Sequence, residues 1–501
     1  MRKIMIFCLV LSTMVLGSCK KFLAEYSQDE MRPGSTDDLA ALMYSDAYPY
    51  LSSMDNIDLL TDDVQSNGLA VQNNVPVASY VTAMANGTPV FTYDPTMFDG
   101  NNPIPSGVNL YEIYYAKIKG CNVILDQLAN VQGTEQAKNA ILGQCLFLRA
   151  FYHFKLVSLY ALPYRGAGVN PETTLGIPLI LSSQVRDGGL SRPSLKQTYD
   201  QVEKDLLQSA DLLKANYTPT SVFRVGAAAA YACLSRFYLY RGLDSDVDQV
   251  IAYANKALEL RNTLTSLSTF VIGNNVNTGK GIFDIGNTEV LWTFGGVETN
   301  YFPALTTNTT PPFTASSSLL SLYDKGTGNT NYGDLRYQMY FSKYVNNGQF
   351  PYTSGKVNTT PNTSGAKGFR VSEVYLNRAE ALILRFIKNG DAADGTQALA
   401  DLNYIRSNRY DTRNTAYVPI SITDGQALFT FYQQERRREL NLEDRHRWQD
   451  IRRWSIPVTH VFIGADGVTT TYTLPANSPL YALPIPYTAL NNNPDLIQNP
   501  R

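Results

Sequence analysis

Near the C-terminus stands the stretch Glu435–Trp454, ERRRELNLEDRHRWQDIRRW, which is dense in charge and holds two of the three tryptophans. Three bulky side chains, Trp448, Ile451 and Trp454, recur within it at helical spacing. That recurrence predicts a helix across the stretch, with one anchored face and an otherwise charged surface.

The charges of this stretch are ordered so that they can pair along a helix. Glu443 and Asp444 precede Arg447 by four and three residues, and Asp450 precedes Arg453 by three. Acid before base at this spacing is the favourable order for side-chain pairing. Arginines beside tryptophans also favour guanidinium groups that stack on the rings and make bidentate hydrogen bonds with carboxylates.

Two interpretations of the stretch differ in kind. It is either a structural brace or a site for phosphate or nucleic acid, which would need a positive field. The acids nearly balance the arginines, and the whole chain has a net charge of −2 and a pI near 6. We therefore predict a brace and no nucleic-acid partner.

The N-terminus has the pattern of a lipoprotein signal. Arg2 and Lys3 precede an apolar run, Ile4–Leu16, too short to span a membrane in a mature protein. It ends in Leu16-Gly-Ser-Cys19, which matches a bacterial lipobox. We predict that residues 1–18 are removed and that Cys19 carries the lipid anchor; the alternative is an ordinary signal with an incidental cysteine.

The remaining cysteines, Cys121, Cys145 and Cys233, lie in apolar helical patterns without metal spacing. We predict buried free thiols. His153 likewise lies in an apolar helical pattern and is interpreted as a core residue, whereas His446 falls in the charged stretch and His460 in a predicted late loop.

Helical periodicity dominates the chain, and two stretches interrupt it. Residues 52–107 and 262–370 are rich in Asn, Gly, Thr and Pro, the first without helical period and the second with strand-like patches such as Glu289–Phe294. Trp292, in that patch, is predicted to be core. Helices are predicted from the apolar spacing over 36–48, 111–128, 136–160, 195–213, 225–240, 247–258, 371–387 and 397–407.

Several ordered motifs resemble the SusD/RagB family of outer-membrane nutrient-binding lipoproteins from Bacteroidetes. Glu435–Glu443 and Arg447–Trp454 match the two halves of its C-terminal signature. Earlier and later matches are Cys19–Leu23, Tyr115–Asn122, Phe147–Phe154, Gly176–Leu179, Glu373–Ala381, Leu402–Arg406, Leu483–Pro486 and Gln498–Pro500. Ala24 and Ala489 depart from the family pattern, which has acidic residues there.

The resemblance implies a mostly α fold. It would be one SusD-like domain over residues 19–501, with about four tetratricopeptide-type helix pairs and an irregular side with short strands. The scaffold would cover 36–260 and 371–455, and the insertions 52–107 and 262–370. The resemblance further implies anchoring at the outer membrane, on the cell surface, and delivery of captured oligosaccharide to a TonB-dependent SusC-like transporter barrel.

Candidate ligand-binding residues come from the insertions, because family members that bind glycans do so there. Aromatic rings pack on sugar faces, and amide or carboxylate groups bond hydroxyls. The charge-poor, tyrosine-rich composition, with 17% charged residues and 33 tyrosines, fits a surface protein that meets neutral polar ligands. The candidates are Asp62, Asp63, Tyr80, Tyr93, Phe98, Asn101, Tyr301 and Phe302.

Catalysis is not expected. The chain has three histidines and none of the common hydrolase, Walker or dinucleotide motifs. The adjacent acids Asp62 and Asp63 are candidates for acid chemistry, which would make the protein a surface glycoside hydrolase, or for contact with ligand hydroxyls; ligand contact is the expectation.

Two further readings stay open. One is a SusD/RagB-like protein that captures peptide or another non-sugar nutrient, and the other is a pure tetratricopeptide scaffold, which the long aromatic insertions disfavour. No cofactor is expected, and a structural Ca²⁺ in an insertion has no supporting pattern.

Overall fold

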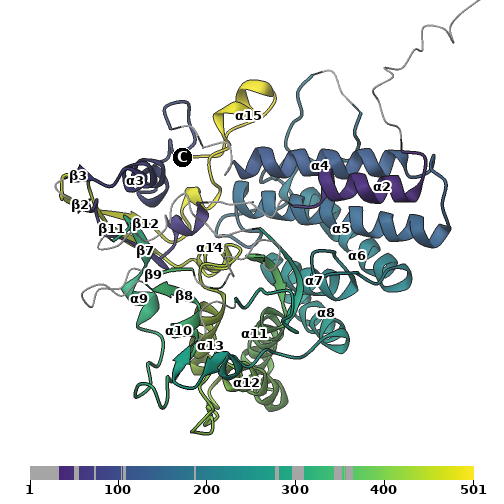
Figure 1. Ribbon diagram of the computed structural model, residues 1–501. Coiled ribbons are helices and arrows are strands. Elements are labelled where there is room, and N and C mark those ends of the chain that lie inside the picture. The colour runs from purple at the N-terminus through teal and green to yellow at the C-terminus, as the bar shows by residue number, and fades with distance from the viewer. Residues whose placement is uncertain are drawn as a thin grey trace, which may run out of the picture.

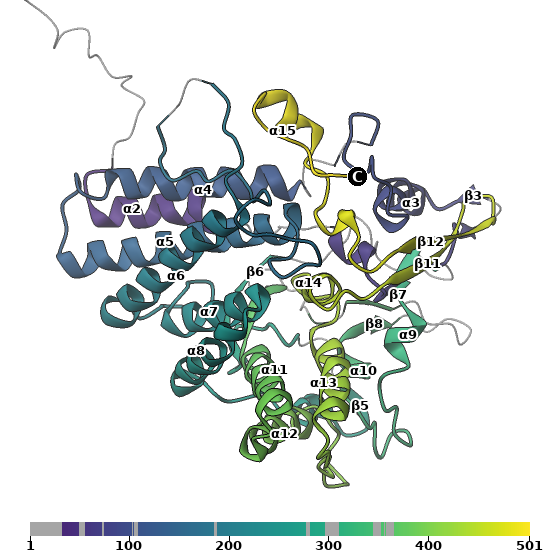
Figure 2. The same cartoon turned by 180° about the vertical axis from the view of Figure 1, so that it is seen from behind.

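In the computed structural model, a helical array occupies one side of the molecule and most of the short strands occupy the other (Figure 1, and from behind in Figure 2). Helix α14 and the C-terminal segment lie between the two sides. The structure describes residues 33–49, 56–72, 75–102, 104, 109–184, 188–276, 281–295, 310–343, 352–354, 356 and 365–501.

The array consists of long helices, most of them where the apolar spacing predicts helix. The first expected helix is an α-helix continued by a π-helical turn, Met43–Ala47. The members are α2 (Thr36–Leu42), α4 (Leu110–Gln127), α5 (Glu135–Tyr160), α6 (Leu195–Asn216), α7 (Ala227–Arg241), α8 (Val247–Leu260), α11 (Val371–Asn389), α12 (Ala392–Ser407) and α13 (Gly425–Leu440).

Local sequence signals set the ends of these helices. Thr134 accepts a hydrogen bond from the backbone N–H of Ala137 and so starts α5. Ser194 and Gln197 form a reciprocal capping box at α6. Gly242, in the left-handed conformation, ends α7.

Helix α5 is the centre of the array. By length and composition it could cross a membrane, but 94% of its apolar window is buried in the fold, as in the core helix of a globular protein. His153 is fully buried within it, as predicted. The cysteines of the described residues, Cys121, Cys145 and Cys233, are buried and free, also as predicted.

Successive helices pack side by side along the array. The pairs in contact include α4 with α5, α5 with α6, α7 with α8, and α11 with α8, α12 and α13. The π-helical turn lies tight against α4: a Cβ on Gly120 would stand 2.3 Å from the carbonyl oxygen of Asp46. The helix-pair arrangement is therefore confirmed, while its classification as tetratricopeptide-type stays a prediction.

The strands of the described residues form two-stranded antiparallel sheets. β6 (Val290–Phe294) pairs with β10 (Lys367–Arg370) and confirms the predicted strand around Trp292, whose side chain is fully buried. The other pairs are β1 (Val64–Ser66) with β7 (Phe313–Ala315), β2 (Val71–Gln72) with β3 (Val75–Pro76), β4 (Val271–Ile272) with β5 (Asn275–Val276), β8 (Phe341–Lys343) with β9 (Tyr352–Ser354), and β11 (Val458–Ile463) with β12 (Thr469–Leu474).

Short helices complete the strand-bearing side and the C-terminus. These are α9 (Ser317–Leu320), α10 (Arg336–Met339), α14 (His446–Arg453) and α15 (Tyr487–Asn492). His460 lies in β11 and is buried, so its placement in a loop was wrong.

The first insertion contains a helix that the sequence analysis did not predict, α3 (Ala78–Phe91). Its buried residues, Tyr80, Ala83, Met84, Gly87, Val90 and Phe91, follow helical spacing. Gly87 lies on this face, and the position suits a glycine because a Cβ there would stand 2.5 Å from the Phe313 ring. Pro89 is tolerated close to the C-terminal end of the helix, although proline usually interrupts helical hydrogen bonding.

The stretch Glu435–Trp454 is not one helix, so that prediction was wrong. Helix α13 ends at Leu440, and α14 begins at His446. Between them Leu442, Asp444 and Arg445 have φ angles of 47°, 45° and 67°, in the left-handed region. Non-glycine residues rarely adopt this conformation, so the break depends on tertiary contacts.

Only one of the three predicted pairs along the stretch forms. Asp450 contacts Arg453 at 2.9 Å. Glu443 instead contacts Lys356 and Arg370, at 3.0 and 2.7 Å. Asp444 contacts Lys155 and Arg236 at 2.6 and 2.8 Å, so both acids are turned away from Arg447.

The stretch nevertheless serves as a brace. Glu439 lies fully buried among three arginines, Arg336, Arg370 and Arg409, at 3.1, 2.9 and 2.9 Å. Arg370 and Arg409 also share Glu289, which precedes β6. Such a network fixes geometry more than it adds stability, because desolvation offsets much of the attraction. The structural interpretation is confirmed, since arginines of the stretch are themselves buried and paired, as Arg436 is with Asp450 at 2.9 Å.

Candidate functional site

The first insertion is fixed to the C-terminal part of the chain by His460. Its ring stacks on Phe91 and on Tyr93, with centroids 4.1 and 4.8 Å apart. Its two nitrogens lie 2.7 and 3.0 Å from the carbonyl oxygens of Phe91 and Thr61. Burial lowers the pKa of His460, and the two carbonyl contacts oppose that shift; the ring serves as a packing element.

Asp62 and Asp63 form the second attachment. The Arg447 guanidinium donates two hydrogen bonds to the Asp62 carboxylate, at 2.7 and 2.8 Å. Arg437 donates to Asp63 at 2.6 Å and to the backbone carbonyl of Asp62 at 2.8 Å. Burial raises the pKa of Asp62, but the hydrogen bonds and charge of Arg447, together with the charge of Arg437, outweigh burial and hold that pKa below its usual value.

This geometry favours a structural role for both acids. Each carboxylate is directed at an arginine, and Asp63 is fully buried. A glycoside hydrolase needs two carboxyl groups that face each other across a substrate, with one free to donate a proton. The pair Asp62–Asp63 does not have that arrangement in this structure.

The predicted aromatic residues lie inside the fold. Tyr80, Tyr93 and Phe98 are 0%, 6% and 3% exposed. Burial removes the rings of Tyr80 and Tyr93 from a ligand in this conformation, whereas Phe98, although buried, lies in the lining of a pocket. Cys19, Tyr301 and Phe302 lie outside the described residues, so their roles stay predictions.

Asn101 is exposed and borders a pocket of about 180 Å³ beside α3. Its side-chain amide, like that of Asn86, has no hydrogen bond to the described part of the chain. Asn102 is held by hydrogen bonds from its amide to Thr96. The lining is Asn56, Ala85, Asn86, Pro89, Val90, Met97, Phe98, Asn101, Asn102 and Ile104.

The chemistry of this pocket is neutral and polar over an apolar base. Four asparagines line it, and none of its lining residues in the described part of the chain is ionisable. Each amide offers two N–H donors and one carbonyl acceptor, which suits groups that both donate and accept, such as hydroxyls. Val90, Met97 and Phe98 are buried and supply the apolar surface.

Three of these four asparagines were not among the predicted residues. Asn56 and Asn86 lie in the same Asn-rich insertion, and Asn102 follows the predicted Asn101. The amide-rich composition of the insertion was the available signal, but the prediction favoured aromatic rings over amides.

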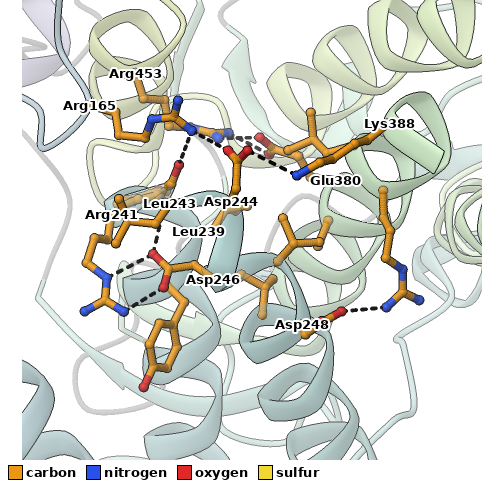
Figure 3. Close-up of a pocket in the computed structure, with 18 of the residues that line it drawn as sticks. Arg165, Leu239, Arg241, Leu243, Asp244, Asp246, Asp248, Glu380, Lys388 and Arg453 are labelled. Carbon is orange, nitrogen blue, oxygen red and sulfur yellow. Dashed lines mark hydrogen bonds and ion pairs between the residues drawn. The ribbon is translucent and has the colours of Figure 1, made fainter.

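A second and larger cavity lies in the helical array. It measures about 580 Å³ and is bordered by the α7–α8 turn, the second half of α11, Phe429 and Trp454 (Figure 3). Charged side chains surround it. Among the described residues, no group of three or more His, Cys, Asp or Glu side chains is arranged to hold a metal ion.

Two family models of related proteins match this chain. Residues 41–239 match a family described as "Starch-binding associating with outer membrane", SusD-like, and residues 273–501 match the SusD family. No curated protein matches the chain.

Solved structures share the fold at low sequence identity. A putative sugar-binding protein from Bacteroides vulgatus is 21% identical, with a TM-score of 0.67 over 94% of this chain and 99% of its own. A SusD superfamily protein from Bacteroides thetaiotaomicron is also 21% identical, with a TM-score of 0.67 over 93% and 100%. A SusD-like carbohydrate-binding protein from Bacteroides vulgatus is 19% identical, with a TM-score of 0.64 over 92% and 97%.

Proposed function

This chain belongs to the SusD family, and from that premise we propose that it captures glycan at the cell surface and delivers it to a TonB-dependent SusC-like transporter of the outer membrane. The family description and the structural neighbours named as sugar-binding or carbohydrate-binding support the first half. Delivery to the barrel follows from the family resemblance, and anchoring through Cys19 from the lipobox at Leu16–Cys19 together with that resemblance.

The amide-lined pocket beside α3 is the observation that carries this proposal. Its asparagines would exchange hydrogen bonds with ring hydroxyls, and its apolar base would contact the C–H face of one sugar unit. Sites built in this way combine a mostly apolar surface with a few placed polar groups. These contacts between the described pocket residues and a sugar would form without a metal ion or cofactor.

The same lining predicts the kind of glycan. Uronic acids and sulfated sugars bind best where a cation can offset their charge. The polar side chains that the described residues offer in the pocket are amides, so we expect neutral oligosaccharides to bind and acidic ones to bind weakly.

The test is binding of the soluble protein, without residues 1–19, to a panel of neutral and acidic polysaccharides and of peptides, by affinity electrophoresis and calorimetry. Asn86→Ala and Asn101→Ala should each weaken binding of the retained glycan by roughly fivefold to tenfold, since one hydrogen bond contributes about 1 kcal/mol. Asn130→Ala, an exposed asparagine beyond the end of α4, is the matched control.

Three results would contradict the proposal. Equal affinity of the wild type and both pocket variants for a bound glycan would place the site elsewhere. Binding of peptides with no glycan bound would favour the non-sugar nutrient instead. Measurable hydrolysis of a bound glycan would show an enzyme.

A further inference from the structure

The cavity in the helical array has the size of a small-molecule site. Its volume of about 580 Å³ falls within the range of roughly 300–1,000 Å³ typical of ligand pockets. It shares no lining residue with the pocket beside α3. A ligand here would therefore be bound independently of the proposed glycan site.

The inner wall of the cavity is apolar. Leu239, Val250 and Ala381 are buried there, and Leu384 is 37% exposed. Trp454 is half-buried at one side. The Arg453 guanidinium lies 4.2 Å above its ring, and the Phe429 ring meets it edge-on at 5.9 Å. These contacts fix the indole in place.

The rim carries charges of both signs, drawn from different elements (Figure 3). Asp244 contacts Arg165 at 2.7 Å and Lys388 at 3.2 Å, and so links the loop after α5 to the end of α11. Asp248, at the start of α8, contacts Arg385 at 2.7 Å. Arg165 and Asp248 lie on opposite sides of the cavity.

These rim pairs differ from the buried pairs of the brace. The side chains of Arg165, Asp244 and Lys388 are 56%, 67% and 64% exposed, and that of Asp248 is 76% exposed. Exposed ion pairs are weak because water screens them, so their members can change partners at little cost. Arg453, by contrast, is held by Glu380 and Asp450.

The rim pairs also leave bonding capacity on both sides. Arg165 uses a single terminal nitrogen, Nη1, for Gly242 and Asp244, and Asp248 uses a single oxygen, Oδ1, for Arg385. The remaining guanidinium nitrogens of Arg165 and the second oxygen of Asp248 have no partner in the described part of the chain. A cationic donor and an anionic acceptor thus face one apolar cavity.

We propose that this cavity binds a small zwitterion with an apolar body, of the chemical class of a dipeptide. Its carboxylate would contact Arg165 and Lys388, its ammonium group would contact Asp248, and its side chains would lie against Leu384 and Trp454. Each ligand charge would take the place of one member of an exposed rim pair, Asp244 on the Arg165 side and Arg385 on the Asp248 side. The inference goes beyond glycan capture, because it gives the protein a second site for another class of ligand.

Trp454 provides a direct readout. The other two tryptophans, Trp292 and Trp448, are fully buried, so a ligand at the cavity should change the emission of Trp454 alone. We would titrate the soluble protein with Leu-Leu, N-acetyl-Leu-Leu and Leu-Leu amide, and follow the same titrations by calorimetry. Leu-Leu should saturate one site, and each capped form should bind roughly tenfold or more weakly, because each lacks one charged contact.

Charge-removing variants locate the two ends of the ligand. Asp248→Asn should reduce the preference for Leu-Leu over its N-acetyl form, and Arg165→Gln should reduce the preference over its amide. Lys196→Gln, which removes one member of an exposed pair with Asp200 on α6, is the control and should change neither ratio. Trp454→Phe should abolish the emission change while calorimetry still detects Leu-Leu.

Several outcomes would overturn the inference. These are absence of Leu-Leu binding, equal binding of the three forms, and unchanged ratios in Asp248→Asn and Arg165→Gln. Loss of Leu-Leu binding in Asn101→Ala would show a single shared site rather than a second one.

Salt should weaken binding of Leu-Leu, because the Debye length falls from about 10 Å at 0.1 M to about 3 Å at 1 M.

Discussion

Arg447 holds Asp62 through two parallel hydrogen bonds, although 385 residues separate the two in the sequence. The Arg447 side chain is 9% exposed, and the Asp62 side chain is 27% exposed. This contact attaches the start of the first insertion to α14. The insertion in turn carries the amide-lined pocket, so the contact helps to position the proposed glycan site.

Removing the acid from this contact should destabilise the fold. Asp62→Asn leaves the largely buried Arg447 without a charged partner, and loss of one member of a buried pair costs about 3–5 kcal/mol. We expect a fall near 3 kcal/mol in the free energy of unfolding, because Asp62 is partly exposed. Urea denaturation measures it. Lys196→Gln, in an exposed pair, should leave stability unchanged, and an equal effect of both variants would contradict the prediction.

Phe98 and Asn101 should separate packing from ligand contact. Phe98 is 3% exposed, so Phe98→Ala should cost about 3–5 kcal/mol of stability. Asn101 is exposed, so Asn101→Ala should change stability by no more than about 0.5 kcal/mol and should act on glycan affinity instead. Thermal unfolding and calorimetric binding, measured on both variants, test the distinction. A stable Phe98→Ala protein would show that the ring does not support the core.

Lys155 should make stability depend on pH. Burial lowers its pKa from 10.5 to about 7, although Asp444 opposes the shift. The unfolded chain therefore binds more protons than the folded one between about pH 7 and 10.5, and the free energy of unfolding should rise with pH across that window. Below about pH 7 both states are protonated, and the penalty is constant.

The comparison with Lys155→Met isolates this effect. The difference in unfolding free energy, wild type minus variant, should rise between pH 7 and 10.5, measured by urea denaturation at fixed ionic strength. A difference that falls or stays level over that range would show that the lysine remains charged in the folded protein.

Gly120 should tolerate no side chain. A Cβ there would meet the Asp46 carbonyl oxygen at 2.3 Å, so α4 and the π-helical turn would have to separate. We expect Gly120→Ala to cost about 1–3 kcal/mol, as overpacking usually does. Gly286→Ala is the control, because nothing lies within 4 Å of its Cβ position. Equal melting temperatures of the two variants would refute the close approach.

Cys19 should determine membrane attachment. Cys19→Ala removes the thiol on which acyl chains would be assembled, so the protein should move from the membrane fraction to the soluble fraction and lose metabolic labelling with fatty acid. Cys121→Ala, which removes a buried free thiol, should leave labelling unchanged. Membrane association that persists in Cys19→Ala would place the anchor elsewhere.

The helical array could be predicted because its apolar residues repeat at helical spacing. Helix α3 was missed because Gly87 and Pro89 are typical of turns and obscure its helical spacing. The need for a glycine beside Phe313 arises only in the folded protein. The break between α13 and α14 has no local signal, since none of its left-handed residues is a glycine. Its acids find partners such as Lys356 and Lys155, which lie far away in the sequence.

The candidate site was predicted in part. Two of the predicted residues, Phe98 and Asn101, lie in the lining of a pocket, whereas Tyr80 and Tyr93 are buried elsewhere; ligand contact by any of them stays a prediction. Periodicity within an irregular insertion does not tell which aromatic rings pack against the rest of the molecule. His460 in β11 decides this for Tyr93, and it follows that residue by 367 positions.

The long-range contacts of Asp62, Lys155 and Arg192 also bear on the order of folding. Their partners lie in the last part of the chain, Arg447 for Asp62, Asp444 for Lys155 and Asn499 for Arg192. Closing loops of this length is entropically costly and slow. We expect a nascent chain to stay incompletely folded until its final residues emerge, which would keep it competent for export in an unfolded state. Protease resistance acquired by a chain truncated after Leu440 would disprove this.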